Sequence, residues 1–201
     1  AYCGDRNATL KWSQEAIIHY RLKETGTWAT YDGIPETRLG LEGHHQVHNA
    51  ANAVICARRF GWSKAAIRKG LREAKHPGRF EIISRTPRII LDGAHNPEGI
   101  TALVERLKEE SKPVTLLCSI LRDKDREAML AQLRSITSDI YETTFDFPRA
   151  RTIEELQQDG GNVTTVEAFF AQLNKNRTYV VTGSLYFISE VRQMYTNSFT
   201  K

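Results

Sequence analysis

The chain has 201 residues, enough for one hydrophobic core or two smaller ones. Hydrophobic residues make up 40%, charged residues 26%, and the formal net charge is +4, a balance typical of a globular protein. No apolar run approaches the roughly 20 residues of a membrane span, and no signal peptide opens the chain, so we expect a cytoplasmic protein without membrane contact. The basic residues are spread out and form no stripe with interleaved aromatics, which argues against nucleic acid as a partner.

The first 42 residues are β-rich and irregular, with turn signals at Asp32-Gly33 and at Pro35. Two stretches favour strands, Thr27–Tyr31 and Thr37–Leu41. Three cysteines (Cys3, Cys56 and Cys118) are odd in number and widely spaced. Since Cys56 and Cys118 lie in apolar surroundings, reduced packing residues are the expectation.

Two helices are predicted next, Asn49–Phe60 and a second one capped by Ser63 that continues to Ala74. Before them, His44 and His48 have an i, i+4 spacing that could chelate zinc. No third ligand is evident, so we assign no metal site. Asn49 either presents its amide to a purine or hydroxyl, or acts as the N-cap of its helix.

From Arg79 onward strands and helices alternate, which predicts an α/β fold: a Rossmann-like, mostly parallel sheet with helices on both faces. The strands are predicted at Phe80–Ser84, Arg88–Leu91, Val114–Cys118, Ile140–Thr143 and Thr178–Thr182, and the helices at Glu98–Glu110, Lys124–Ile136, Ile153–Gln158, Val166–Leu173 and Ser184–Tyr195. We place the boundary between two domains at 84/85, giving 1–84 and 85–201. The first part is too small for a complete α/β domain, and the chain starts at Ala1, so we expect a fragment.

The stretch Asp92–Pro97 is the most informative, because an acid and a histidine follow a buried strand and precede a helix. Ligands of open α/β sheets bind outside the carboxyl ends of the strands, where an acid can hold a ribose hydroxyl and a helix N-terminus favours anions. The alternative is local: Asn96 and Pro97 simply cap and start the helix.

Three further motifs share this edge of the predicted sheet. Arg79 follows a glycine at a strand start and could bind phosphates as a bidentate fork, or be an ordinary surface arginine. Lys124 could hold a substrate carboxylate; the alternative is that Asp123 caps the helix and Lys124 is solvated. The turn at Gly183-Ser184 offers backbone N–H groups and a hydroxyl to the same crevice.

Taken in order, these motifs resemble the folylpolyglutamate synthase and dihydrofolate synthase family of the Mur ligase superfamily. The resemblance covers nearly the whole chain, through Gly43–Ala53, Pro77–Glu81, Asp92–Pro97, Leu121–Asp125, Thr144–Ala150 and Val181–Arg192. It implies the tail of a central ATPase domain followed by a Mur ligase carboxyl-terminal domain. It also implies a monomeric parent enzyme that uses ATP and Mg²⁺ to join L-glutamate to a folate, a tetrahydrofolate derivative, through an acyl phosphate.

The resemblance also implies roles for single residues. Asn49, Arg79 and Asp92 match ATP contacts, at the adenine, the phosphates and the ribose respectively. Arg79 would also stabilise charge on the transferred phosphoryl group. His95 matches an active-site residue near the reacting groups. Two positions, Lys124 and Ser184, are similar to those that hold the incoming glutamate.

The chain also departs from the family pattern. The sequence G-x-x-x-x-G-K-[ST] of a P-loop is absent, and the family's metal ligands lie in its amino-terminal portion, so the histidines near Asn49 do not take that role. We therefore expect this chain alone to lack ligase activity and to bind ATP weakly. Two alternatives remain: a fragment of a Mur-type peptidoglycan amino-acid ligase, and a non-catalytic module that binds a nucleotide or a partner. Gly93 and the turn Thr182–Leu185 favour the folate branch.

Overall fold

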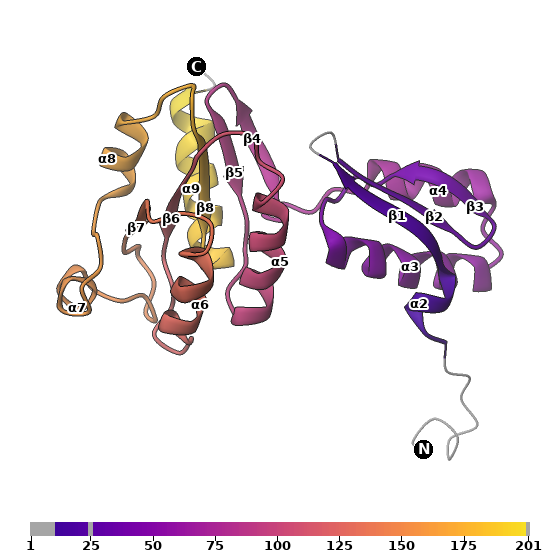
Figure 1. Ribbon diagram of the computed structural model, residues 1–201, viewed down its shortest axis with the longest axis horizontal. Helices are drawn as coiled ribbons and strands as arrows, with labels where there is room; N and C mark the ends of the chain where they lie inside the picture. The colour runs from indigo at the N-terminus through magenta and orange to yellow at the C-terminus, as the bar shows by residue number, and fades with distance from the viewer. Residues whose placement is uncertain (1–10, 24–25, 200–201) are drawn as a thin grey trace, which may run out of the picture. The chain divides into compact units, whose positions relative to one another are not determined.

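The structure, a computed structural model, describes residues 11–23 and 26–199 and divides after Lys75 into two compact units, each with its own sheet and core (Figure 1). This division lies earlier than the boundary predicted at 84/85. The reason is strand pairing: β4 (Glu81–Arg85) is hydrogen-bonded to β5 (Arg88–Leu91), so it belongs to the second sheet.

The first unit is an antiparallel sheet of three strands packed against helices. Its elements are α2 (Ser13–Ala16), β1 (Ile17–Lys23), β2 (Gly26–Tyr31), β3 (Ile34–Arg38), α3 (His44–Arg59) and α4 (Lys64–Glu73). A buried tyrosine joins the layers, since the Tyr31 hydroxyl donates to the carbonyl oxygen of Val47 in α3 at 2.9 Å. The core therefore fixes α3 on the sheet.

Two local predictions in this unit are wrong and two are confirmed. Helix α3 begins at His44, so Asn49 lies inside the helix and is not its N-cap. The turn predicted at Pro35 is also wrong, because Pro35 lies within β3. The turn predicted at Asp32-Gly33 is confirmed, and Gly33 there has a φ of +71°. The predicted cap of α4 is confirmed, because the Ser63 hydroxyl accepts the backbone N–H of Ala66 at 3.2 Å.

The second unit contains a five-stranded sheet in the order β4-β5-β8-β6-β7, in which only β4 runs antiparallel to its neighbour. This confirms the predicted mostly parallel sheet. The further elements are α5 (Pro97–Leu107), β6 (Val114–Cys118), α6 (Arg126–Leu133), β7 (Ile140–Glu142), α7 (Ile153–Gln158), α8 (Val166–Ala171), β8 (Thr178–Thr182) and α9 (Leu185–Phe199).

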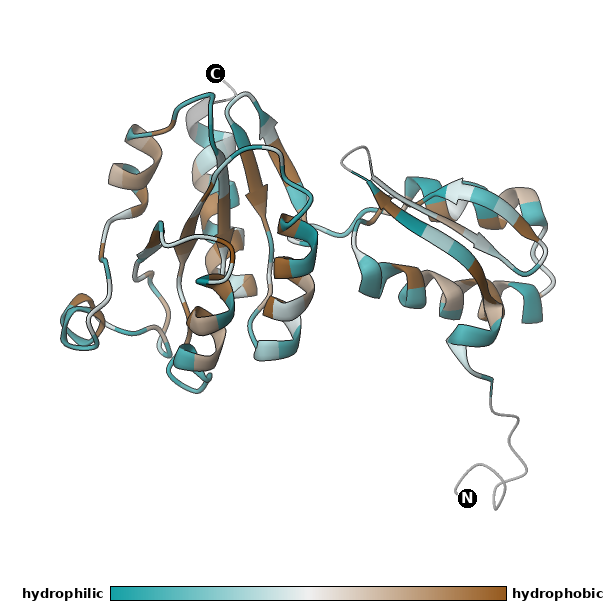
Figure 2. Cartoon of the chain, in the orientation of Figure 1, coloured by the Kyte–Doolittle hydropathy of each residue, from teal (hydrophilic) through white to brown (hydrophobic). Residues whose placement is uncertain are grey.

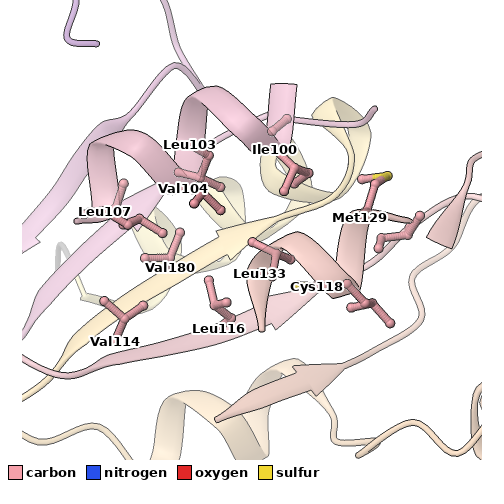
Figure 3. Packing of buried hydrophobic residues seen from close by; sticks show 14 of the residues in the cluster. Ile100, Leu103, Val104, Leu107, Val114, Leu116, Cys118, Met129, Leu133 and Val180 are labelled. Carbon is pink, nitrogen blue, oxygen red and sulfur yellow. The ribbon is translucent and has the colours of Figure 1, made fainter. Parts of the chain in front are cut away.

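Helices cover both faces of this sheet, because successive side chains of its buried strands point to opposite sides. In β8, Val180 packs with α5 and α6, and Figure 3 shows Leu103 and Val104 above it and Leu133 to its right. Its neighbour Val181 packs with α8 and α9 on the other side. The central strands are accordingly mostly hydrophobic in Figure 2. Each such side chain contributes about 1.5–3 kcal/mol through burial.

The two described cysteines differ in their surroundings. Cys118 is fully buried in the sheet, as predicted, and burial raises the pKa of its thiol. Cys56 is exposed on α3, so its prediction as a packing residue is wrong. Cys3 lies outside the described residues. In the described part of the chain, no helix combines the length and the apolar character needed to cross a membrane.

Candidate functional site at the carboxyl edge of the sheet

Three loops meet where β5, β8 and β6 end, because parallel strands present their carboxyl ends at one edge. The middle loop is bonded to both neighbours: Gly183 N–H donates to the Ala94 carbonyl at 3.0 Å, and Ser119 N–H donates to the Thr182 carbonyl at 3.1 Å. Gly183 has a φ of +103°, and a Cβ there would lie 2.7 Å from the carbonyl oxygen of Ser119. Glycine is therefore required at this turn.

Asp92 lies at the end of β5 and is only 8% exposed. One carboxylate oxygen accepts the N–H of Ala94 at 2.9 Å, and the other accepts the N–H of Phe80 at 2.8 Å. Burial raises the pKa of Asp92, while these two donors and the nearby charge of Arg79 act in the opposite direction. The carboxylate thus joins the Asp92 loop to the segment that carries Arg79.

Arg79 is half-buried, and its charge acts on Asp92. Within the described ranges 11–23 and 26–199, no side chain or carbonyl forms a hydrogen bond or an ion pair with its guanidinium. This is unlike most buried or half-buried arginines of the unit, such as Arg126, which forms a bidentate pair with Glu142 at 2.6 and 2.8 Å. An arginine of this kind can bind an anion without first breaking an internal pair.

His95 is half-buried, and its Nδ1 lies 2.8 Å from the carbonyl oxygen of Gly93. Since a carbonyl only accepts, Nδ1 carries the proton, and Nε2 of the neutral ring is left as an acceptor. The local alternative for the next two residues is confirmed: Asn96 accepts the N–H of Gly99 at 2.8 Å as the N-cap of α5, and Pro97 is its first residue. The loop therefore combines a helix start with an oriented imidazole.

Lys124 lies in the loop just before the N-cap of α6, with its Nζ 3.2 Å from a carboxylate oxygen of Asp123. The same oxygen accepts a hydrogen bond from Arg149 at 3.0 Å. The predicted helix cap at Asp123 is wrong, because Asp125 accepts the N–H of Ala128 and is the N-cap. All three charged groups are partly exposed, so the cluster can rearrange around a substrate carboxylate.

Ser184 is almost fully buried, at 1% exposure, and its hydroxyl oxygen lies 3.2 Å from the N–H of Tyr186. It therefore caps the first turn of α9, a use that the sequence motif alone did not reveal. The side chain keeps its own hydroxyl hydrogen for a further acceptor.

An aromatic cluster beside these loops was missed by residue-level reasoning. The rings of Phe147 and Tyr186 are stacked, 4.4 Å apart with an interplanar angle of 23°, and Phe145 is parallel to Phe147 at 5.5 Å. The guanidinium of Arg149 lies 5.4 Å from the centre of the Phe147 ring. The signal that could have revealed this cluster is the run Phe145–Arg149. The sequence analysis used that run only as part of a family motif.

Asn49, in the first unit, is exposed on α3. It lines an apolar groove of about 480 Å³ between α3 and α4, together with small residues such as Ala50 and Ala53. Its amide nitrogen donates to Gln46 Oε1 at 3.1 Å, and its side-chain carbonyl oxygen can accept a hydrogen bond from another group. His44 and His48 lie on the same helix, but among the described residues no group of three His, Cys, Asp or Glu side chains could hold a metal ion.

Residues 78–185 match the family described as "Mur ligase, glutamate ligase domain". Folylpolyglutamate synthase of Lacticaseibacillus casei is 38% identical over 181 residues, covering 83% of this chain and 42% of the relative. Dihydrofolate synthase/folylpolyglutamate synthase of Bacillus subtilis is 32% identical, covering 79% of this chain and 41% of the relative. This chain therefore spans less than half the length of these relatives.

Solved structures agree. Escherichia coli FolC in complex with ADP superposes with a TM-score of 0.81 at 28% identity, covering 100% of this chain and 51% of the other. Folylpolyglutamate synthase of Mycobacterium tuberculosis, complexed with ADP and AMPPCP, gives 0.81 at 25% identity, covering 96% and 51%. With the family match over more than half of its residues, this chain belongs to the Mur ligase family, as a relative of the folylpolyglutamate and dihydrofolate synthases.

Proposed function

We propose that this chain is the carboxyl-terminal part of an ATP-dependent ligase that adds L-glutamate to a folate, with dihydrofolate synthesis as a second activity to test. The observation that carries the proposal is the pairing of two loops at one sheet edge: the buried Asp92 is bonded to the segment of Arg79, whose guanidinium has no partner in the described part of the chain. An anion such as a phosphate group fits that arginine.

In this proposal ATP is a substrate. Arg79 binds its phosphates and stabilises the charge that develops during phosphoryl transfer to the folate carboxylate. Asp92 accepts a ribose hydroxyl through the lone pairs that its two backbone donors leave. Asn49 contacts the adenine, which suits an apolar groove lined also by the amides of Gln46 and Asn49.

The glutamate amine then attacks the acyl carbon of the acyl phosphate: the C–N bond forms, the C–O bond to phosphorus breaks, and inorganic phosphate and one amine proton are released. His95 Nε2 is the acceptor that lies in this loop, so it can take part in the attack step or position the reacting groups. Lys124 and Ser184 hold the incoming glutamate. The pair between Lys124 and Asp123 is partly exposed and screened by solvent, so a glutamate carboxylate can replace it. Mg²⁺ would neutralise phosphate charge, and its ligands are expected outside this chain.

The full-length protein tests the proposal through ATP- and glutamate-dependent elongation of a reduced folate. We expect Arg79→Ala to lower kcat roughly 10²–10³-fold, the effect of removing a donor to transition-state charge. Arg134→Ala is the matched control, since Arg134 is the exposed C-cap of α6 and its side chain pairs, among the described residues, with Glu127 alone, at 3.8 Å. Normal turnover by Arg79→Ala and Asp92→Ala would contradict the assignment.

Two further outcomes distinguish the alternatives. Ligation of an amino acid to a peptidoglycan nucleotide precursor, without folate elongation, would favour the peptidoglycan branch; a diaminopimelate ligase of Clostridium perfringens is 25% identical over 151 residues. The chain alone should be inactive, and micromolar binding of ATP with Mg²⁺ in calorimetry would contradict the need for another part of the enzyme. A monomeric state and a cytoplasmic location are also proposed, to be checked by sedimentation and cell fractionation.

A further inference from the structure

We propose that Asp92 is a positioning residue for Arg79: its carboxylate holds the backbone on one side of the arginine, and so fixes the direction of the guanidinium. This inference rests on the proposed function only for what Arg79 binds. The contacts of the Asp92 carboxylate with Phe80 and Ala94 lie entirely within the second unit.

The backbone around Arg79 is held from both sides. On the amino-terminal side, the Gly78 carbonyl accepts the N–H of Gly93 at 2.7 Å. On the carboxyl-terminal side, the N–H of Phe80 donates to Asp92 at 2.8 Å. Both anchors come from the single loop that follows β5. The position of Arg79 is therefore set by that loop and not by contacts of its own side chain.

Phe80 is the residue that needs an anchor. It has a φ of +44°, a left-handed conformation that is unfavourable for a bulky side chain. Phe80 is 6% exposed, and the guanidinium of Arg106 lies over its ring, 4.8 Å from the ring centre, so moving the ring out of this site would cost its burial and this contact. Without the hydrogen bond to Asp92, the backbone is the part that would relax, and Arg79 is the adjacent residue.

A carboxylate suits this task because it offers an acceptor on each side. One oxygen of Asp92 serves Phe80 and the other serves Ala94. Asparagine has nearly the same shape but only one acceptor oxygen, so its amide nitrogen would face one of the two N–H donors. Asp92→Asn therefore removes one anchor while it keeps the volume of the buried side chain.

The first experiment measures amide hydrogen exchange in this chain, for the wild type and Asp92→Asn. We expect exchange at Phe80 or Ala94 to accelerate about tenfold or more, with Ile90 in β5 unchanged. Glu110→Gln is the control, because Glu110 is buried at the opposite end of the same sheet and pairs with Arg88 at 2.7 Å. Equal exchange at both amides in wild type and variant, or equal acceleration in the control, would overturn the proposal.

The second experiment uses the full-length ligase and a double-mutant cycle. If Asp92 acts through Arg79, Asp92→Asn lowers kcat about 10- to 100-fold, and the double variant with Arg79→Ala is no slower than Arg79→Ala alone. Multiplied losses would overturn the proposal. So would a rise in KM for ATP at unchanged kcat, which indicates a ribose contact only. A wild-type enzyme without folate ligase activity would refute the proposed function, while the exchange experiment still decides whether Asp92 fixes this segment.

Discussion

Replacing Gly183 with alanine should strongly destabilise the second unit, because two independent penalties meet at this turn. The φ of +103° is a conformation that L side chains rarely adopt, and it costs on the order of 1–3 kcal/mol. A Cβ would also lie 2.7 Å from the carbonyl oxygen and 2.9 Å from the carbonyl carbon of Ser119. These are backbone atoms, so no side-chain rotation can remove the clash.

The clash adds to the strain because both backbones are held in place. The N–H of Gly183 donates to Ala94, and the N–H of Ser119 donates to Thr182. Separating the two segments by several tenths of an ångström weakens both hydrogen bonds, each worth about 1 kcal/mol. We therefore expect Gly183→Ala to lower the free energy of unfolding by about 3–5 kcal/mol.

Gly160 provides the matched control. It has a φ of +73° in the same unit, but a Cβ there would meet no atom within 4 Å. Gly160→Ala thus measures the conformational penalty alone, about 1–2 kcal/mol.

Urea unfolding can separate the two units, since the three tryptophans (Trp12, Trp28 and Trp62) all lie in the first one. Far-ultraviolet circular dichroism reports both units, whereas tryptophan fluorescence reports the first. With a slope of about 1–3 kcal/mol per molar urea, Gly183→Ala should move the circular dichroism transition of the second unit by about 2 M. Equal midpoints for Gly183→Ala and Gly160→Ala would refute the reasoning.

Three further predictions concern stability. Arg126→Met should cost about 3–5 kcal/mol, because it leaves the buried Glu142 uncompensated, whereas adding Glu142→Leu should recover most of the loss in urea unfolding. Burial raises the pKa of Asp92 from its ordinary value of 3.8, so between the ordinary and the raised pKa the native state binds more protons than the unfolded state, and stability falls as pH rises through that window. Urea midpoints measured against pH should show this fall in the wild type and lose it in Asp92→Asn. Ser63→Ala should cost about 1 kcal/mol through the cap of α4, seen as an earlier fluorescence transition.

Where chemistry is local, the sequence predicted it. The starts of α4 and α5 follow from one side-chain oxygen and one backbone N–H three residues later, at Ser63 and at Asn96. The two acids before α6 show the limit of this rule. Both have suitable side chains, but Asp123 is engaged by Arg149, from a loop 26 residues away, and Asp125 caps the helix instead. No local pattern contains that competitor.

The predicted start of α3 was wrong for a similar reason. Its N-cap is Gly43, with a φ of +114° and no side-chain cap, and its N–H donates to the Thr27 hydroxyl of β2 at 2.9 Å. A contact from the sheet thus replaces the local signal that would mark the helix start at His44. The predicted alternative, Asn49 as N-cap, used the nearest residue with suitable chemistry and placed the helix too late.

The strand order explains the rest of the candidate site. Alternating strands and helices predict a parallel sheet, but they do not say which strands are neighbours. The last strand, β8, inserts between β5 and β6, and so brings Gly183 to Ala94 and Ser119 from distant parts of the chain. Had β8 been added at an edge, the same motifs would flank different loops, and the turn at Gly183 would meet no backbone that required glycine. The close approach of Gly183 to Ser119, which Gly183→Ala measures, is therefore a consequence of the strand order. The sequence motifs depend on that order but do not specify it.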